Sequence, residues 1–362
     1  MSAFDVIQSA AAIVLTFGLV IFLHEAGHFI LCRILGVRVE RFAFGFGPEL
    51  LGITRGPTRF SICAFPLGGF VKPAGEEMEN YTGQPDEYFS QAWHRRLAIV
   101  AAGPVMNYLL AFALFTTVVL VKGVPEPSPE PIIGNLVLKF PADRAGLQVG
   151  DRVLAINGKA VSTWEEMAKT IHAFPDKRVE LLLEREGRRS RVSLIPQTEP
   201  ETGRGVIGIT PKPVYRPVGL LESISEGARQ CYALTATTVK TLGTMIVRKQ
   251  KPDLAGPIGI SQMISRASRS AWEDFVFLIG FLSVAIGFFN ILPIPLLDGG
   301  HAMMYVLEGI LRRKPPKPVM MVANSLGLAF LVSLLVVATF NDFQRMFFQD
   351  RGQTEQSAPP TP

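Results

Sequence analysis

The sequence predicts a polytopic α-helical membrane protein with four transmembrane helices, membrane-associated β-hairpins and an inserted α+β unit. Apolar residues make up 48% of the 362 positions and charged residues only 19%, a balance unusual for a soluble protein. A membrane-spanning helix takes about 20 predominantly apolar residues. Four stretches meet this requirement: 10–35, 97–121, 275–297 and 319–340.

Charge and cysteine content argue against two other kinds of protein. The net charge of +5 is spread along the chain, without a basic block interleaved with aromatic residues, so nucleic-acid binding is not expected. The three cysteines, at 32, 63 and 231, form neither a disulfide framework nor a CxxC metal site. The first apolar stretch has no Lys or Arg before it and is long, so we expect a retained span rather than a cleaved signal peptide.

The first apolar stretch contains the motif His24-Glu25-Ala26-Gly27-His28. Two histidines four apart lie on one face of a helix, as two metal ligands must, and the glutamate between them is placed to activate water on the metal. This is the HExxH pattern of zinc peptidases. Ionisable residues deep in a hydrophobic span are costly to bury, which favours a functional site over two histidines packed at a helix interface.

Basic residues near the ends of the apolar stretches predict the orientation of the chain. Arginines follow the first stretch and precede the second, and a cluster of Lys and Arg at 312–317 separates the third from the fourth. By the positive-inside rule, both of these loops face the cytoplasm. Both termini and residues 122–273 are then expected on the outside.

The first cytoplasmic loop has the pattern of β-hairpins. Apolar residues alternate along 38–46, and further strand-like pieces follow at 59–62 and 65–71, bounded by Gly and Pro. These hairpins are apolar enough to dip into the membrane surface, where an unpaired edge beside the metal site would pair with an extended substrate. A hairpin that serves only as a lid is an equally good alternative. The candidate substrate-binding residues here are Gly45, Gly47, Gly68, Gly69 and Phe70.

The second apolar stretch contains a polar residue, Asn107, shortly after Gly103 and Pro104. Glycine and proline allow close approach of neighbouring helices, and a buried amide needs a partner. We therefore expect a structural role for Asn107 rather than a chemical one.

Residues 123–213 predict the inserted unit. After a stiff polyproline-like spacer at 123–131 we expect strands at 132–138, 152–156, 178–185 and 190–195, a helix at 163–173 and a closing strand at 205–209. The run AGLxxGDxVLxINGxxV at 145–161 resembles bacterial PDZ domains, which bind peptide C-termini by strand addition. A spacer that only restricts access is an equally good alternative.

The next part, 214–272, contains an amphipathic helix at 220–247 that is expected on the membrane or under the PDZ domain.

The third apolar stretch ends in a second informative segment, 287–301. Pro293 and Pro295 break the helix, so its backbone must line a cavity or be covered by protein. Asp298 is a carboxylate at membrane depth and supplies the third ligand that the HExxH motif lacks. Asn290 is placed to hydrogen-bond a substrate backbone or a developing oxyanion, with helix packing as the alternative. His301 has two equally good interpretations. It either supports one of the metal ligands without binding the metal itself, or it has a capping or structural role.

Taken together, HEAGH, GFGP, PLGGFVK, GPxxN, the PDZ-like insert, LAGPIGI and NxxPxPxLDGGH resemble the site-2 proteases, specifically their bacterial RseP-like branch. The resemblance covers nearly the whole chain, with one PDZ domain where some relatives have two. It implies one zinc ion per chain, held by His24, His28 and Asp298, with Glu25 as general base and Asn290 holding the substrate. It also implies that the hairpin presents the substrate as an added strand.

The resemblance further implies the cell location and the partners. The family lies in the bacterial inner membrane, with the active site toward the cytoplasmic side, and cuts single-span membrane proteins such as anti-sigma factors or remnant signal peptides. A site-1-type protease acts first.

The sequence divides into 1–122, 123–213, 214–272, 273–349 and a disordered tail, 350–362. The alternatives are a non-catalytic PDZ adaptor that keeps a metal site, and a transporter, which the lack of an internal repeat disfavours.

Overall fold

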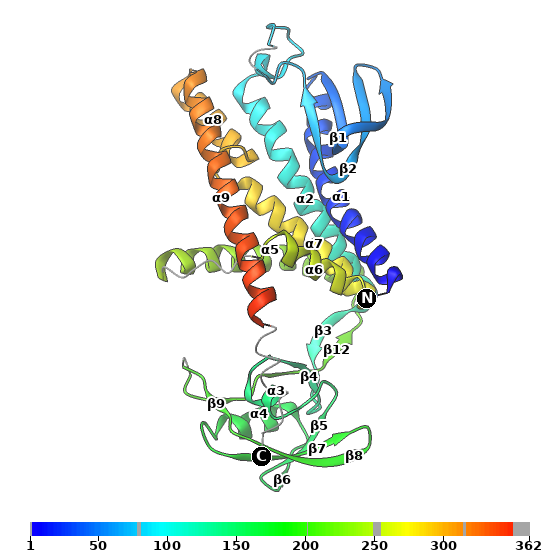
Figure 1. Ribbon diagram of the computed structural model, residues 1–362, viewed down its shortest axis with the longest axis vertical. Coiled ribbons are helices and arrows are strands. Elements are labelled where there is room, and N and C mark those ends of the chain that lie inside the picture. Colours follow the sequence, from blue (N-terminus) through cyan, green and yellow to red (C-terminus); the bar gives the residue numbers. More distant parts are fainter. Residues whose placement is uncertain (1, 78–80, 201, 249–254, 314–315, 350–362) are drawn as a thin grey trace. The chain divides into compact units, whose positions relative to one another are not determined.

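The structure is a computed structural model that describes residues 2–77, 81–200, 202–248, 255–313 and 316–349 (Figure 1). The chain forms two compact units. One consists of Met1–Val119 together with Leu220–Pro362, and the other is the insert Leu120–Gly219. The predicted tail at 350–362 lies outside the described residues.

Four helices among the described residues are long and apolar enough to cross a membrane, as predicted. They are α1 (Ala3–Ile34), α2 (Trp93–Lys122), α7 (Trp272–Ile291) and α9 (Lys317–Gln349). The predicted break at the two prolines is confirmed: within the apolar stretch 275–297, α7 stops at Ile291 and Leu292 is already extended, because Pro293 and Pro295 cannot continue the helix. A helix that the sequence analysis did not predict, α8 (Asp298–Leu311), begins directly after this break.

Glycines and small polar groups bring α1, α2 and α7 into close contact. A Cβ atom at Gly27 of α1 would lie 2.4 Å from the Ala102 carbonyl oxygen of α2, so only glycine fits there. From α7, the Ser283 hydroxyl donates to the Asn107 carbonyl oxygen of α2 at 2.8 Å. The helix α2 therefore packs closely against both α1 and α7.

The cytoplasmic-loop prediction of separate hairpins was wrong in detail. The structure has one strongly bent strand pair, β1 (Val39–Arg55) and β2 (Thr58–Pro73). Phe42 pairs with both Val71 and Phe60, so the first part of β1 lies between two parts of β2. Gly45 and Gly47 bend β1 with φ values of +88° and +84°, a backbone conformation that favours glycine.

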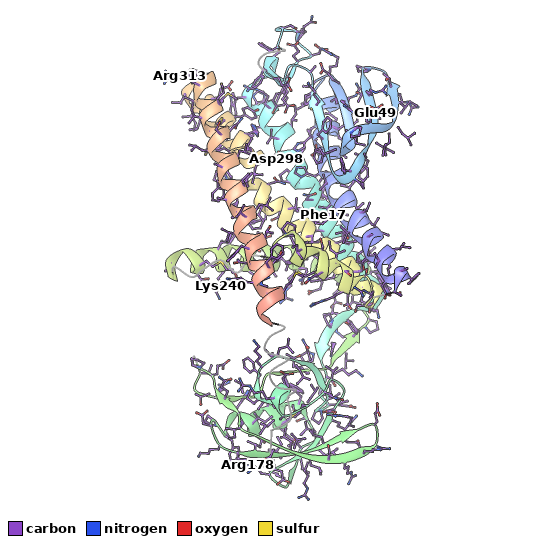
Figure 2. The ribbon with its side chains drawn as sticks, viewed as in Figure 1. Phe17, Glu49, Arg178, Lys240, Asp298 and Arg313 are labelled. Carbon is purple, nitrogen blue, oxygen red and sulfur yellow. The ribbon has the colours of Figure 1, made fainter. Side chains whose placement is uncertain are left out.

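A polar cluster ties the bent strands together around Glu49, labelled in Figure 2. Its carboxylate accepts hydrogen bonds from Arg59, from Ser61 at 2.7 Å and from Arg41 at 3.2 Å. The bonds from Arg59 and Ser61 lower the pKa of the Glu49 carboxyl to about 2. Apolar side chains of the same strands are exposed, among them Leu50, Leu51, Ile53, Ile62 and Phe65.

The insert is an α+β unit around a four-stranded sheet. Its strands are β5 (Arg152–Ile156), β6 (Lys159–Ala160), β7 (Val179–Arg185) and β8 (Arg188–Leu194), in the spatial order β6-β5-β7-β8. Its helix α4 (Trp164–His172) begins at a capping box between Thr163 and Glu166. The buried core includes Ile133, Val153, Ile156, Leu181 and Leu183. Other elements of the insert are α3 (Pro141–Arg144) and the strands β4 (Ile133–Leu136), β9 (Gln197–Thr198), β10 (Gly205–Val206) and β11 (Ile209–Pro211).

Two predictions for the insert need correction. The closing strand at 205–209 does not join the main sheet, because β10 pairs with β9 and β11 pairs with β4. The polyproline-like spacer contains a strand, β3 (Val124–Pro127), which pairs with β12 (Pro213–Arg216). Proline is tolerated on such a strand because a two-stranded ribbon leaves half of its backbone groups unpaired.

Two helices follow the insert in the chain. The predicted amphipathic helix is α5 (Leu220–Arg248), and the short helix after it is α6 (Pro257–Ala267). The N-terminus of α6 is capped from α9, because the Asp342 carboxylate accepts from the amide groups of Gly256 and Gly259, both at 3.0 Å. A short 3₁₀ helix, η1 (Tyr88–Ser90), precedes α2.

Candidate active site

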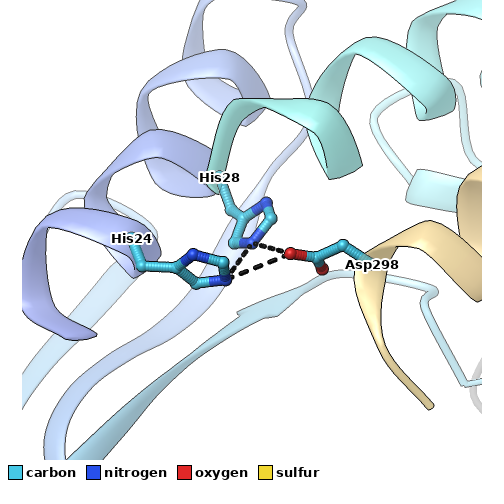
Figure 3. A group of neighbouring side chains, drawn as sticks. All are labelled: His24, His28 and Asp298. Carbon is cyan, nitrogen blue, oxygen red and sulfur yellow. Dashed lines mark hydrogen bonds and ion pairs between the residues drawn. The ribbon is translucent and has the colours of Figure 1, made fainter. Parts of the chain in front are cut away.

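Three side chains predicted as metal ligands meet at one point (Figure 3). The Nε2 atoms of His24 and His28 project from the same face of α1 and lie 3.2 Å apart. Asp298, the first residue of α8, places its Oδ2 atom 3.1 Å from His24 Nε2 and 3.5 Å from His28 Nε2. The break after α7 therefore brings a carboxylate from late in the chain to the two histidines of α1.

The donor set fits a zinc ion. Tetrahedral ligands at about 2.1 Å from a common ion lie about 3.4 Å from one another, close to the separations of these three atoms. Asp298 Oδ2 is buried and, apart from the approach of the two imidazole nitrogens, has no hydrogen-bond partner among the described residues, as expected for an atom whose partner is a cation. Two imidazoles and one carboxylate leave the fourth position open, which is the arrangement of catalytic zinc sites.

The helix α2 holds both imidazoles from behind. His28 Nδ1 lies 2.8 Å from the Ile99 carbonyl oxygen, and His24 Nδ1 lies 3.3 Å from the Asn107 side-chain nitrogen. Between these two contacts, a Cβ atom at Gly103 would lie 2.3 Å from His28 Nε2, so the glycine leaves room for the ring. The sequence analysis expected only a structural role for Asn107; its contact with His24 depends on helix packing that local sequence does not reveal.

Glu25 lies against the edge of β2. Its Oε2 accepts a hydrogen bond from the Val71 amide at 3.1 Å, and a Cβ atom at Gly69 would lie 3.5 Å from Glu25 Cγ. The carboxylate of the predicted base is thus held beside the strand that we expect to receive the substrate.

A cavity of about 630 Å³ surrounds the site. Glu25 and the three ligands line it, as do Asn290, Phe70 and His301 of the sequence analysis. Gly45, Gly47, Gly68 and Gly69 are not among the lining residues, and their predicted contact with substrate stays a prediction. The bend of β1 explains why glycine occupies positions 45 and 47, and Gly68 makes room for the Phe46 ring.

The cavity also contains a carboxyl group that the sequence analysis did not identify. Glu76 follows β2 and lines the cavity together with Tyr88 and Tyr305. Burial raises the pKa of the Glu76 carboxyl to about 7, and the nearby Glu25 carboxylate raises it as well, whereas His28 opposes the rise. No spacing rule points to Glu76, because it becomes part of the site only through the fold of β2.

The chain matches known proteins over nearly its full length. Residues 12–334 match Peptidase family M50. A chain of Clostridium acetobutylicum assigned to the zinc metalloproteases is 34% identical over 347 residues, an alignment that covers 94% of this chain and 98% of the relative. The zinc metalloprotease RasP of Bacillus licheniformis is 30% identical over 426 residues, which cover 94% of this chain and all of the relative (100%).

Two further similarities are more distant. The regulator of sigma-W protease RasP of Bacillus subtilis is 27% identical over 424 residues, covering 94% of this chain and 99% of RasP. The solved PDZ domain of an SdrC-like protein from Listeria monocytogenes is 20% identical and covers 24% of this chain and 93% of that domain, with a TM-score of 0.22. On the family match and the full-length relatives, the chain belongs to peptidase family M50, the site-2 proteases, and is a zinc metalloprotease.

Proposed function

We propose that this zinc metalloprotease cleaves peptide bonds within or near the transmembrane segments of single-span membrane proteins. The zinc ligands in this proposal are His24, His28 and Asp298, and Glu25 is the general base. The observation that carries it is the convergence of the three donor atoms within 3.1–3.5 Å of one another, beside a cavity lined by residues of α1 and α7, two of the helices apolar enough to cross a membrane.

The chain's own residues account for the proton transfers. A zinc ion at this site supplies Lewis-acid activation of water and of the scissile carbonyl. Glu25 takes the proton of the attacking water and later passes it to the leaving amine. The hydrogen bond from the Val71 amide at 3.1 Å holds the Glu25 carboxylate in orientation without blocking its second oxygen.

The substrate must be extended when it is cut. A transmembrane helix hides its carbonyl groups in internal hydrogen bonds, so it has to unwind before hydrolysis. The outer edge of β2 beside Glu25 offers backbone groups to an extended segment, and Asn290 lines the same cavity. Substrates with Gly, Pro or polar residues in the span are therefore cut faster than a uniform poly-leucine span.

The proposal includes a location and a reaction order. The basic loops orient the protein in the bacterial inner membrane with the site toward the cytoplasm and the insert, with both termini, outside. One relative is named as a regulator of sigma-W protease, which supports membrane substrates such as anti-sigma factors. Remnant signal peptides are the other substrate class, and a prior cut by a site-1-type protease exposes both.

The test compares purified native protein with Glu25→Gln and Asp298→Ala on a trimmed single-span substrate with a Gly-containing span. His94→Ala, which changes an exposed histidine outside the cavity, is the matched control. We expect native protein and His94→Ala to hold about one zinc and to cleave, and Glu25→Gln to hold zinc without cleaving. Asp298→Ala should lose zinc.

Two results would contradict the proposal. If Glu25→Gln cleaved at the native rate, Glu25 would not be the base. If native protein held zinc and released no product from Gly-containing, Pro-containing and poly-leucine spans alike, the non-catalytic adaptor with a retained metal site would be the better description.

A further inference from the structure

Asn107 of α2 lies directly behind one of the proposed ligands. Its side chain is fully buried, with no exposed surface (0%), and its amide nitrogen is 3.3 Å from His24 Nδ1. The other amide atom, Oδ1, is buried as well and has no hydrogen-bond partner among the described residues. Rotating the amide by half a turn therefore breaks no other hydrogen bond and exchanges the atom that faces His24.

Which atom faces His24 decides where the imidazole holds its proton. A histidine that binds a metal through Nε2 carries its proton on Nδ1, and that N–H needs an acceptor. An amide oxygen accepts, whereas an amide NH₂ group donates and would keep the proton off Nδ1. Amide nitrogen and oxygen have nearly the same shape, so either orientation fits the same space.

His28 provides the comparison within the same site. Its Nδ1 faces the Ile99 carbonyl oxygen at 2.8 Å, an atom that only accepts. The proton of His28 is thereby held on Nδ1, and Nε2 is left with its lone pair directed at Asp298 and His24. For His24, the corresponding acceptor has to come from the side chain of Asn107.

We propose that Asn107 is a positioning residue for the zinc site, which holds the proton of His24 on Nδ1 by accepting it with Oδ1. This inference rests on the proposed ligand role of His24. The backbone of Asn107 is fixed independently, because its carbonyl oxygen accepts from Ser283 of α7 at 2.8 Å. Gly287 of α7 faces it closely, and a Cβ atom there would lie 3.1 Å from Asn107 Cβ. The side chain is thus presented to His24 from a rigid helix contact.

The test measures zinc affinity of the full-length protein by competition with a chelator. Asn107→Asp keeps the shape and can only accept, so it should bind zinc at least as tightly as native protein. Asn107→Leu has a similar size without an acceptor and should bind zinc about 10- to 100-fold more weakly. Thr117→Val is the matched control: it removes an exposed hydroxyl from the same helix, away from the cavity, so its zinc affinity should stay within about twofold of the native value.

The pattern of the variants separates this role from packing. If Asn107→Asp weakened zinc binding as much as Asn107→Leu, the amide would act as a donor and the proposal would be overturned. Native affinity in Asn107→Leu would overturn it too. If Asn107→Leu did not fold, as judged by helical circular dichroism, the zinc affinity of Asn107→Asp compared with that of native protein would still test the proposal. Failure of the proposed function has a different signature: native protein without zinc, or a Glu25→Gln variant that cleaves.

Discussion

At the scale of single residues, the two imidazoles beside Gly103 leave no room for a side chain at this position. A Cβ atom at this position would lie 2.3 Å from His28 Nε2 and 2.7 Å from His24 Cε1, closer than any ordinary contact. Alanine is the better helix former by about 1 kcal/mol, so selection for helix stability alone would not place glycine here. The glycine is explained by the space that the rings need.

We predict that Gly103→Ala lowers zinc affinity by about tenfold or more, because the displaced rings no longer converge with Asp298. The fold should persist, as judged by circular dichroism. Gly243→Ala is the matched control: it lies in α5, and a Cβ atom there has no neighbour within 4 Å. Chelator competition on both variants measures the difference, and equal affinities would contradict the prediction.

The residues of the site differ in how far the sequence reveals them. His24, His28 and Asp298 were predicted from chemistry and helix spacing, and the structure brings their donor atoms together; their role as ligands stays a prediction. The contacts of Asn107 and Gly103 depend on how α1 packs on α2, which no local pattern specifies. Sequence reasoning finds residues whose chemistry is unusual for their surroundings, and misses those whose importance comes from a neighbour.

At the scale of elements, α8 is attached to the N-terminal end of α2 by a buried ion pair. Arg96 Nη2 donates to Glu308 Oε1 at 2.5 Å, and the two side chains are only 1% and 11% exposed. The Arg96 guanidinium also lies 4.6 Å above the ring of Tyr305. Because α8 begins at Asp298, these contacts help to fix the helix that carries the third proposed ligand.

Removing one partner of a buried pair leaves an uncompensated charge, so Arg96→Met should destabilise the protein by about 3–5 kcal/mol. Replacing both partners, in Arg96→Met/Glu308→Leu, should recover most of this loss. Arg229→Met, which breaks an exposed pair on α5, should cost less than about 1 kcal/mol. Thermal denaturation in detergent ranks the variants, and a double variant no more stable than Arg96→Met would refute the idea.

Among the helices and strands, those with a strong local signal were predicted, and those that depend on distant parts of the chain were not. The four long helices were predicted because hydrophobic length is a strong local signal. The apolar stretch 275–297 runs past the end of α7 at Ile291 because hydrophobicity continues there, whereas the two prolines predicted the break in the helix. The pairing of β3 with β12 was missed because the two strands come from opposite ends of the insert.

At the scale of the whole molecule, the insert has its own core and should fold when excised as Leu120–Gly219. Its fully buried Asp151 carboxylate accepts from Arg185 at 2.6 and 2.7 Å. Burial raises the pKa of Asp151, but the hydrogen bonds from Arg185 and from the Gln148 amide outweigh it, and the pKa lies below its ordinary value.

The lowered pKa of Asp151 predicts that acid destabilises the insert. A lowered carboxyl pKa contributes stability above the unfolded value of about 3.9, and the contribution is lost as the pH falls through the lower folded value. We expect a cooperative thermal transition of the excised insert at pH 7, a lower midpoint at pH 3, and a smaller difference between the two in Asp151→Asn. Circular dichroism measures all three. An Asn variant with the native pH dependence would show that Asp151 does not carry it.

The positions of the three proposed ligands along the chain have a consequence for biosynthesis. Two are in the first helix and the third opens α8, close to the end. While the chain is being made, the HExxH helix enters the membrane long before its carboxylate partner exists. A nascent chain that has not yet reached Asp298 has two of the proposed ligands and the proposed base but lacks the third ligand, so our proposal implies that proteolytic competence arises only after α8 has been made.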